Sequence, residues 1–165
     1  MKTYTIIKKP EILDWTCVPI APIDIHLQKE TVDISATAQV CYDEEALYVR
    51  LTANEKNIRA EHTSPLGAPC EDSCLEFFFS PIYGDDRYFN IEYNPNCCIY
   101  LGIGSGIHDL VRLVPGVDIP FSPKVMKTDS GWEITYHIPF EFIRRFFPDF
   151  TATSGKQMKG NFYKC

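Results

Sequence analysis

The chain has 165 residues, of which 45% are hydrophobic and 23% are charged, a composition typical of a globular protein rather than a disordered one. Its net charge of −6 at pH 7 argues against nucleic acid or an anionic membrane as a partner. No run of about 18 apolar residues occurs, so we predict no membrane span. We expect residues 1–165 to form one domain.

The chain reads as a series of short strands separated by turn residues. Alternating or β-branched segments predict strands at residues 34–41, 46–53, 74–80, 87–94, 98–103, 110–114, 131–139 and 157–164. Residues 140–147, FEFIRRFF, predict a two-turn amphipathic helix that ends at Pro148. Many short strands with one short helix indicate an all-β fold, an antiparallel two-sheet sandwich of the jelly-roll or immunoglobulin-like type.

Two of the predicted strands carry polar side chains on one face. Side chains alternate between the two faces of a strand, so Asn90, Glu92 and Asn94 share one side of their strand and apolar residues share the other. Glu76 lies on the polar face of the preceding strand. Burial of such a face is costly without partners, so a sugar, a hydrated ion or another polar strand is expected to cover it.

Glu76 and Glu92 are the candidates for carboxylate chemistry if their strands are neighbours. Two carboxylates roughly 5–10 Å apart serve glycoside hydrolysis, which makes a glycoside-processing enzyme one alternative. The same pair serves sugar binding, because carboxylates accept short hydrogen bonds from hydroxyl groups. A third alternative is a protein-interaction module, in which Glu92 pairs with Arg50, Arg59 or Arg112 and no sugar binds.

Other side chains suggest a cation or an aromatic contact. Asp85 and Asp86 in a turn, with Asp72 at a strand start, supply the oxygen ligands that Ca²⁺ prefers, although acidic turn residues are commonly just solvated. Trp132 is a candidate for stacking on a sugar ring. Its place on the apolar face of an alternating strand also favours packing in the core.

The cysteines and the start of the chain bear on the compartment. Seven cysteines form an odd set, so at least one is free or joined to another molecule. Their spacing lacks the second CxxC or HxxxH pair of a zinc site, and we interpret them as reduced thiols in a β core. The opening MKTYTIIKKPEIL lacks the features of a secretory signal, which indicates a cytoplasmic protein, or a periplasmic or secreted one if a leader was removed. The oligomeric state stays open.

Five stretches in order carry a family resemblance: YDEEALYVRL (42–51), EDSCLEFFFSP (71–81), YFNIEYNPNCCIYLGIG (88–104), GWEITYHIPFEFI (131–143) and MKGNFYKC (158–165). Together they resemble the family 9 carbohydrate-binding modules, and more narrowly the bacterial family-9-like domains. The resemblance implies a two-sheet antiparallel sandwich that binds carbohydrate without catalysis, often with structural Ca²⁺.

The resemblance also bears on individual residues. The family's Asp followed four residues later by Glu matches Asp72 and Glu76, which implies that Glu76 contacts the ligand. The stacking Trp six positions before that Glu is replaced by Cys70, and the family's second clamp tryptophan lies beyond the segment that matches NFYKC. We expect a naturally short domain or one that lacks its C-terminal segment. The predicted ligand-binding residues are Glu76, Asn90, Glu92, Asn94, Arg59, Arg112 and Trp132.

Overall fold

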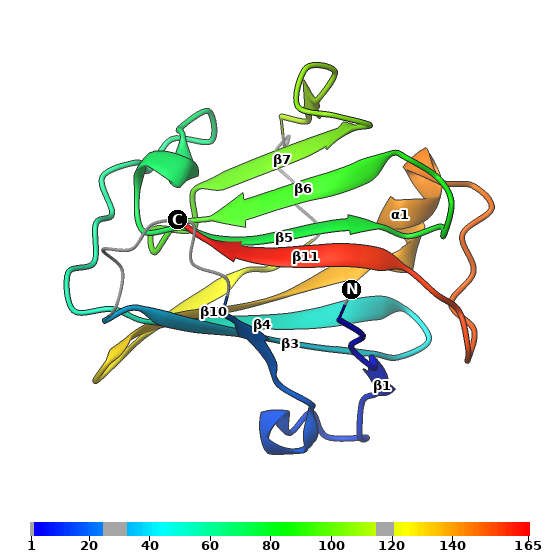
Figure 1. Cartoon of the computed structure of the whole chain (residues 1–165), viewed down its shortest axis with the longest axis horizontal. Helices are drawn as coiled ribbons and strands as arrows, with labels where there is room; N and C mark the ends of the chain where they lie inside the picture. The colour runs from blue at the N-terminus through cyan, green and yellow to red at the C-terminus, as the bar shows by residue number, and fades with distance from the viewer. Residues whose placement is uncertain (1, 25–32, 115–120) are drawn as a thin grey trace.

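Two β-sheets packed face to face make up the computed structural model, which describes residues 2–24, 33–114 and 121–165 (Figure 1). The helix α1 (Phe140–Phe146) lies at one end of the sandwich. The predicted all-β sandwich with one short helix is confirmed. No helix in the described ranges is both long and apolar enough to cross a membrane.

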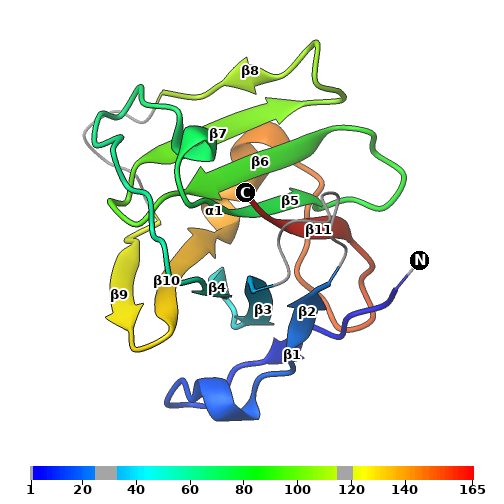
Figure 2. The ribbon, with the colours of Figure 1, turned by 60° about the vertical axis from the view of Figure 1, so that its left-hand side comes forward.

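The first sheet has the order β1-β3-β4-β10-β9, and β2 also pairs with β3. All its pairs are antiparallel except β1 with β3, which is parallel. Figure 2 shows β9 at the edge beyond β10. The strands are β1 (Ile7–Lys8), β2 (Ala21–Ile23), β3 (Ser35–Tyr42), β4 (Ala46–Asn54), β9 (Lys124–Thr128) and β10 (Gly131–Pro139).

The second sheet has the order β11-β5-β6-β7-β8 and is antiparallel throughout. In Figure 2 the short strand β8 lies at its outer edge, beyond β7. A 3-10 turn, η2 (Pro69–Glu71), precedes β5. The strands are β5 (Leu75–Ser80), β6 (Tyr88–Tyr93), β7 (Ile99–Gly104), β8 (Val111–Arg112) and β11 (Lys159–Lys164).

The core between the sheets follows from the alternation of side chains along the strands. Phe77 and Phe79 of β5 point inward and stack with ring centroids 4.7 Å apart, and both rings are buried. Phe89 of β6 joins them and lies 5.4 Å from Phe142 of α1. Each fully buried large apolar side chain contributes about 1.5–3 kcal/mol to folding, so this aromatic cluster fixes α1 against the second sheet.

A buried carboxylate, Glu55, joins the two sheets at the end of β4. It accepts hydrogen bonds from Trp132 Nε1 at 2.7 Å and Ser73 Oγ at 3.0 Å, and Lys164 Nζ of β11 lies 3.2 Å away. Trp132 is fully buried in the core. The prediction that Trp132 contacts a ligand is therefore wrong, because its ring has no exposed face and its N–H is bound to Glu55.

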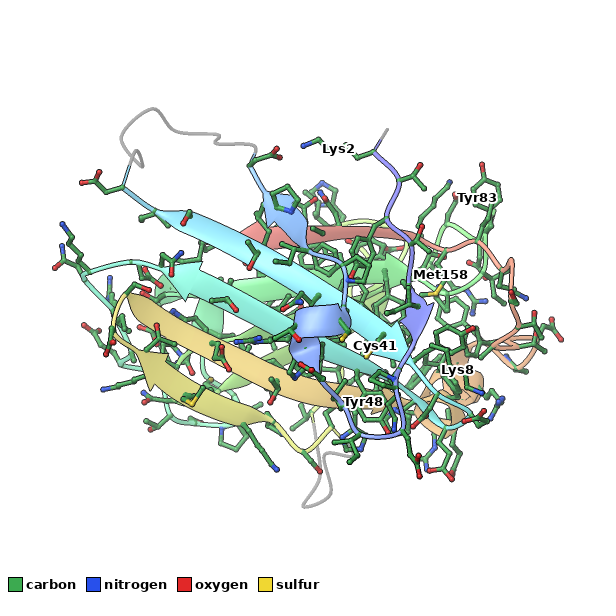
Figure 3. The ribbon with its side chains drawn as sticks, turned by 90° about the horizontal axis from the view of Figure 1, so that it is seen from below. Lys2, Lys8, Cys41, Tyr48, Tyr83 and Met158 are labelled. Atoms are coloured by element: carbon green, nitrogen blue, oxygen red, sulfur yellow. The ribbon has the colours of Figure 1, made fainter. Side chains whose placement is uncertain are left out.

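The N-terminal segment packs on the outer face of the first sheet. Gln39 Nε2 donates to the carbonyl oxygens of Trp15 at 2.7 Å and Val18 at 2.8 Å. The Tyr4 hydroxyl donates to Pro19 O at 2.6 Å. Seen from below in Figure 3, the segment crosses this face beside Cys41, which is fully buried. The segment thus covers part of the first sheet's outer face, while the polar residues of β5 and β6 lie on the second sheet.

Candidate functional site

A row of four side chains crosses the outer face of the second sheet. The register pairs Tyr163 with Glu76, Glu76 with Glu92, and Glu92 with Tyr100, across β11, β5, β6 and β7. Figure 1 shows these four strands side by side. Two acidic side chains therefore lie next to each other between two tyrosines. We call these four residues the acid–tyrosine row.

The two carboxyl groups of the row are buried. Glu76 is 5% exposed and Glu92 is 8% exposed. The two acids are therefore covered by other parts of the chain itself. Tyr163 is the exposed end of the row, with 37% of its surface accessible to solvent.

Burial changes the protonation of the pair. It raises the pKa of Glu92 to about 7; the charge of Glu76 adds to this, while a hydrogen bond from Asn90 and the charge of Arg112 oppose it. Burial also raises the pKa of Glu76, against hydrogen bonds from the thiols of Cys165 and Cys74 and the charge of Lys164. The pair therefore binds a proton more readily than two exposed carboxyl groups do.

Two hydrogen-bond acceptors in this region have no partner among the residues that the structure describes. Asn90 Nδ2 donates to Glu92 Oε1 at 2.8 Å, which places the two predicted residues in contact. The remaining acceptors, Glu92 Oε2 and Asn90 Oδ1, are buried and unpaired. A buried acceptor without a donor costs about 1–3 kcal/mol. The site therefore has two acceptors to which a ligand's donors or a cation could bind.

The predicted ion pair between Glu92 and an arginine is not formed in the described part of the chain. Arg50 pairs with Glu133 on the first sheet. Arg59 is exposed and pairs with Glu61 at 3.0 Å. Arg112 donates to backbone carbonyl oxygens, the nearest being Gly67 O at 2.6 Å.

Arg112 instead positions an aromatic ring of the site. Its guanidinium lies 4.8 Å from the centroid of the Tyr100 ring, within the range of a cation–π contact. It also donates to Leu66 O and Ile99 O, so it ties the loop before η2 to β7. Arg112 therefore lies next to the acid–tyrosine row, whereas Arg59 pairs with Glu61 and Asp72 near the start of β5.

An aromatic strip not foreseen as part of the site borders the row. The Phe78 ring lies 4.9 Å from the Tyr163 ring and 5.9 Å from the Tyr88 ring, by centroids. These rings come from β5, β11 and β6. Residues two apart on a strand share a face, so the sequence alone could have placed Phe78 beside Glu76.

Asn94 has a structural role. It is fully buried, and its Oδ1 accepts hydrogen bonds from the backbone N–H groups of Asn96 and Cys98, both at 2.9 Å. Its Nδ2 donates to His62 O and Asp72 Oδ2. The prediction of Asn94 as a ligand contact is wrong, because its Oδ1 is committed to the turn after β6 and its Nδ2 to His62 and Asp72.

The three predicted calcium ligands do not lie together. Asp72 precedes β5, and its Oδ2 accepts from the backbone N–H groups of Glu61 and His62. Asp85 follows β5 and pairs with Arg87 at 2.6 Å, beside the exposed Asp86. The six residues of β5 separate the two places by roughly 20 Å. These residues do not fit one shared Ca²⁺, and calcium binding stays a prediction.

The family model described as carbohydrate-binding family 9 matches residues 7–165. The chain belongs to this family. The predicted class of function, a non-catalytic carbohydrate-binding domain, is thereby confirmed. None of the curated proteins compared matches the chain.

Solved structures share the fold of this family 9 domain. A protein from Bacteroides uniformis to which carbohydrate binding has been ascribed has a TM-score of 0.79 at 23% identity, covering 99% of this chain and 83% of its own. A family 9 module from Caldicellulosiruptor kristjanssonii in complex with cellotriose has a TM-score of 0.63 at 14% identity, covering 98% and 75%. Its complex with glucose has a TM-score of 0.61 at 16% identity, covering 97% and 75%. At these identities the likeness concerns the fold.

Proposed function

We propose that this domain binds its sugar on the outer face of the second sheet, over the acid–tyrosine row. The observation that carries the proposal is the register, which places Glu76 and Glu92 side by side between Tyr163 and Tyr100. A sugar offers hydroxyl groups at its edge and C–H groups on its faces. The row offers acceptors for the first and aromatic rings for the second.

The aromatic contribution comes from the edge of the sheet. Tyr163 and Phe78 form a contiguous ring surface on β11 and β5, and Tyr163 is exposed. Cys70, which stands where a stacking tryptophan is expected from the family resemblance, supplies no ring. In this proposal Tyr163 takes the stacking role that Cys70 leaves unfilled.

The polar contribution comes from the buried acceptors. Glu92 Oε2 and Asn90 Oδ1 have no hydrogen-bond partner, so sugar hydroxyl groups that donate to them would remove an energetic cost. Because both atoms are buried, the sugar must displace a covering side chain to reach them. Tyr163 lies on β11, one of the two edge strands of this sheet, and we propose that its side chain moves when the ligand binds.

Glucose and cellotriose are the first probes, because relatives of this fold were solved with these sugars. Calorimetric titration of the wild-type domain is expected to detect binding of at least one of them. Tyr163→Ala is expected to weaken that binding by about tenfold or more, which corresponds to about 1.4 kcal/mol. The matched control is Tyr83→Ala, since Tyr83 is an exposed tyrosine in the turn between β5 and β6, outside the row.

Unchanged affinity in both Tyr163→Ala and Glu76→Gln would contradict the proposed location. A wild-type domain that binds neither probe nor any sugar on a glycan array would contradict sugar binding on this face and favour the protein-interaction alternative. Turnover of an aryl glycoside that is lost in Glu76→Gln would favour the enzyme alternative.

A further inference from the structure

Four side chains that commonly bind metal ions meet where β11 joins β5. Cys74 Sγ and carboxylate oxygens of Glu76 and Glu92 lie within 4.8 Å of one another, and all three residues are buried. The Cys165 thiol donates a hydrogen bond to Glu76 Oε1 at 2.9 Å. One sulfur and two carboxylate ligands are therefore gathered in one place, and a second sulfur adjoins them through Glu76.

The backbone holds the two cysteines opposite each other. Cys74 N donates to Cys165 O at 3.2 Å, and Cys165 N donates to Cys74 O at 3.1 Å. This exchange of both hydrogen bonds defines a directly opposed pair of an antiparallel ladder, with side chains on the same face. Figure 1 shows the end of β11 beside the start of β5. Glu76 and Glu92 thus lie on the strands β5 and β6, and the two cysteines extend the ladder by one pair beyond the start of β5 and the end of β11.

A second observation points to a missing cation. Glu92 is only 8% exposed, and its Oε2 is buried without a hydrogen-bond partner in residues 2–24, 33–114 and 121–165. No lysine or arginine in the described ranges pairs with Glu76 or Glu92 within 4 Å. Two buried carboxyl groups without a cationic partner are costly, and a bound cation removes that cost.

We propose that Cys74, Cys165, Glu76 and Glu92 bind a divalent cation that accepts sulfur ligands, with Zn²⁺ as the best match. Zinc takes four ligands in a tetrahedron, with Zn–S near 2.3 Å and Zn–O near 2.0–2.2 Å. Neighbouring ligand atoms are then roughly 3.5 Å apart. The separations of up to 4.8 Å among Cys74, Glu76 and Glu92 reach this by small side-chain movements, and the Cys165 thiol, 2.9 Å from Glu76, completes the set by turning toward the other three.

The chemistry of the donors decides between cations. Ca²⁺ and Mg²⁺ prefer oxygen ligands only, whereas thiolate ligands favour zinc and related metals. The positive charges of Lys164 and Arg112 act on Glu76 and Glu92 respectively, and they offset part of the negative charge of four anionic ligands. The site has no CxxC spacing, because its two cysteines, 74 and 165, are far apart in the sequence.

The test uses Co²⁺ as a spectroscopic probe and Zn²⁺ as a competitor. A phosphine reductant keeps the cysteines reduced, and no sugar is present. We expect one equivalent of Co²⁺ to give the absorption of tetrahedral, thiolate-bound cobalt, and Zn²⁺ to displace it. Ca²⁺ is expected to have no effect. Because no sugar is present, failure of this test leaves the sugar proposal standing, and the reverse also holds.

Single substitutions identify the ligands. Cys74→Ser and Cys165→Ser are each expected to weaken Co²⁺ binding by at least about tenfold and to reduce the thiolate band. Matched controls are Cys41→Ser, which also removes a buried thiol, and Cys17→Ser, which also removes an exposed one. If Cys74→Ser does not fold, then Cys165→Ser and Glu92→Gln carry the test.

Two results would overturn the proposal. One is the absence of stoichiometric Co²⁺ or Zn²⁺ binding by the folded, reduced wild-type chain. The other is a thiolate–cobalt band that survives unchanged in the double variant Cys74→Ser/Cys165→Ser, since that band would then come from other cysteines.

Discussion

Glu76 and Glu92 face each other across β5 and β6, and neither carboxyl group pairs with a lysine or arginine within 4 Å in the part of the chain described. Like charges directly opposite each other on neighbouring strands are destabilising. The two carboxylates therefore destabilise the folded state, and a proton, a cation or a hydrogen-bonded ligand at the pair reduces this cost.

The first consequence is a pH dependence of folding stability. The folded protein holds the Glu92 proton up to a pKa of about 7, whereas the unfolded chain releases it near the ordinary value of 4.5. The folded state therefore binds more protons between these values. The contribution of Glu92 is fully present below pH 4.5, falls as pH rises to about 7, and is constant above it, with a slope of up to about 1.4 kcal/mol per pH unit.

Urea unfolding of chelator-treated protein across this range measures the slope. Glu92→Gln does not titrate, so its stability relative to the wild type is expected to increase from pH 4.5 to 7. Parallel curves for the two proteins would show that Glu92 has an ordinary pKa.

Substitution of Asn94 is expected to cost more stability than substitution of Glu92. Asn94→Ala leaves the backbone N–H groups of Asn96 and Cys98 without their acceptor, and we expect a loss of about 2–4 kcal/mol. Glu92→Gln keeps an acceptor for Asn90 and removes a charge beside Glu76, so we expect no loss of stability at pH 8. Urea melts that give the opposite order would place Glu92, rather than Asn94, at the centre of the polar network.

Lys164 is expected to stabilise the contact between the sheets. Its Nζ lies 3.2 Å from Glu55 Oε2, and the side chains of Lys164 and Glu55 are 9% and 5% exposed. Lys164→Met leaves a buried carboxylate without its cation, and we expect a loss of about 3 kcal/mol in unfolding free energy. Lys159→Met, on the exposed side of the same strand, is the control and is expected to change stability by about 0.5 kcal/mol or less. Equal losses of unfolding free energy in the two variants would show that the buried Glu55 carboxylate does not depend on Lys164.

Gly131 is required at the start of β10. A Cβ at this position would lie 2.0 Å from Ala53 O, a backbone atom in the neighbouring strand β4. We expect Gly131→Ala to cost about 3 kcal/mol or more, because the strands must separate to admit the methyl group. Gly106→Ala, whose Cβ would meet its nearest atom at 3.8 Å, is the control and is expected to be close to neutral in thermal melts. A neutral Gly131→Ala would show that β4 and β10 adapt at this point.

The strands with clear alternation were predictable. The segment 131–139 forms a strand with the predicted bounds, because one face is apolar and glycine and proline stand at its ends. The strands at Ile7–Lys8 and Ala21–Ile23 were missed, since segments this short show no periodicity and form only by pairing with β3. The strand β9, KVMKT, was missed because an exposed edge strand needs no apolar face.

The site was predictable only in part. The placement of Glu76, Asn90 and Glu92 on one face follows from local alternation, and the structure brings these three together. The position of Tyr163 and Cys165 beside them depends on the register between β11 and β5, which no local pattern encodes. Burial of the acids was not predictable either, because it depends on the tertiary packing around the second sheet rather than on local alternation.

The most direct test of the proposed sugar site is an NMR titration of the ¹⁵N-labelled domain with cellotriose. We predict that the largest amide shift changes fall at residues 76, 92, 100 and 163, on four neighbouring strands. Saturable shift changes confined to the first sheet or to the N-terminal segment would contradict the account.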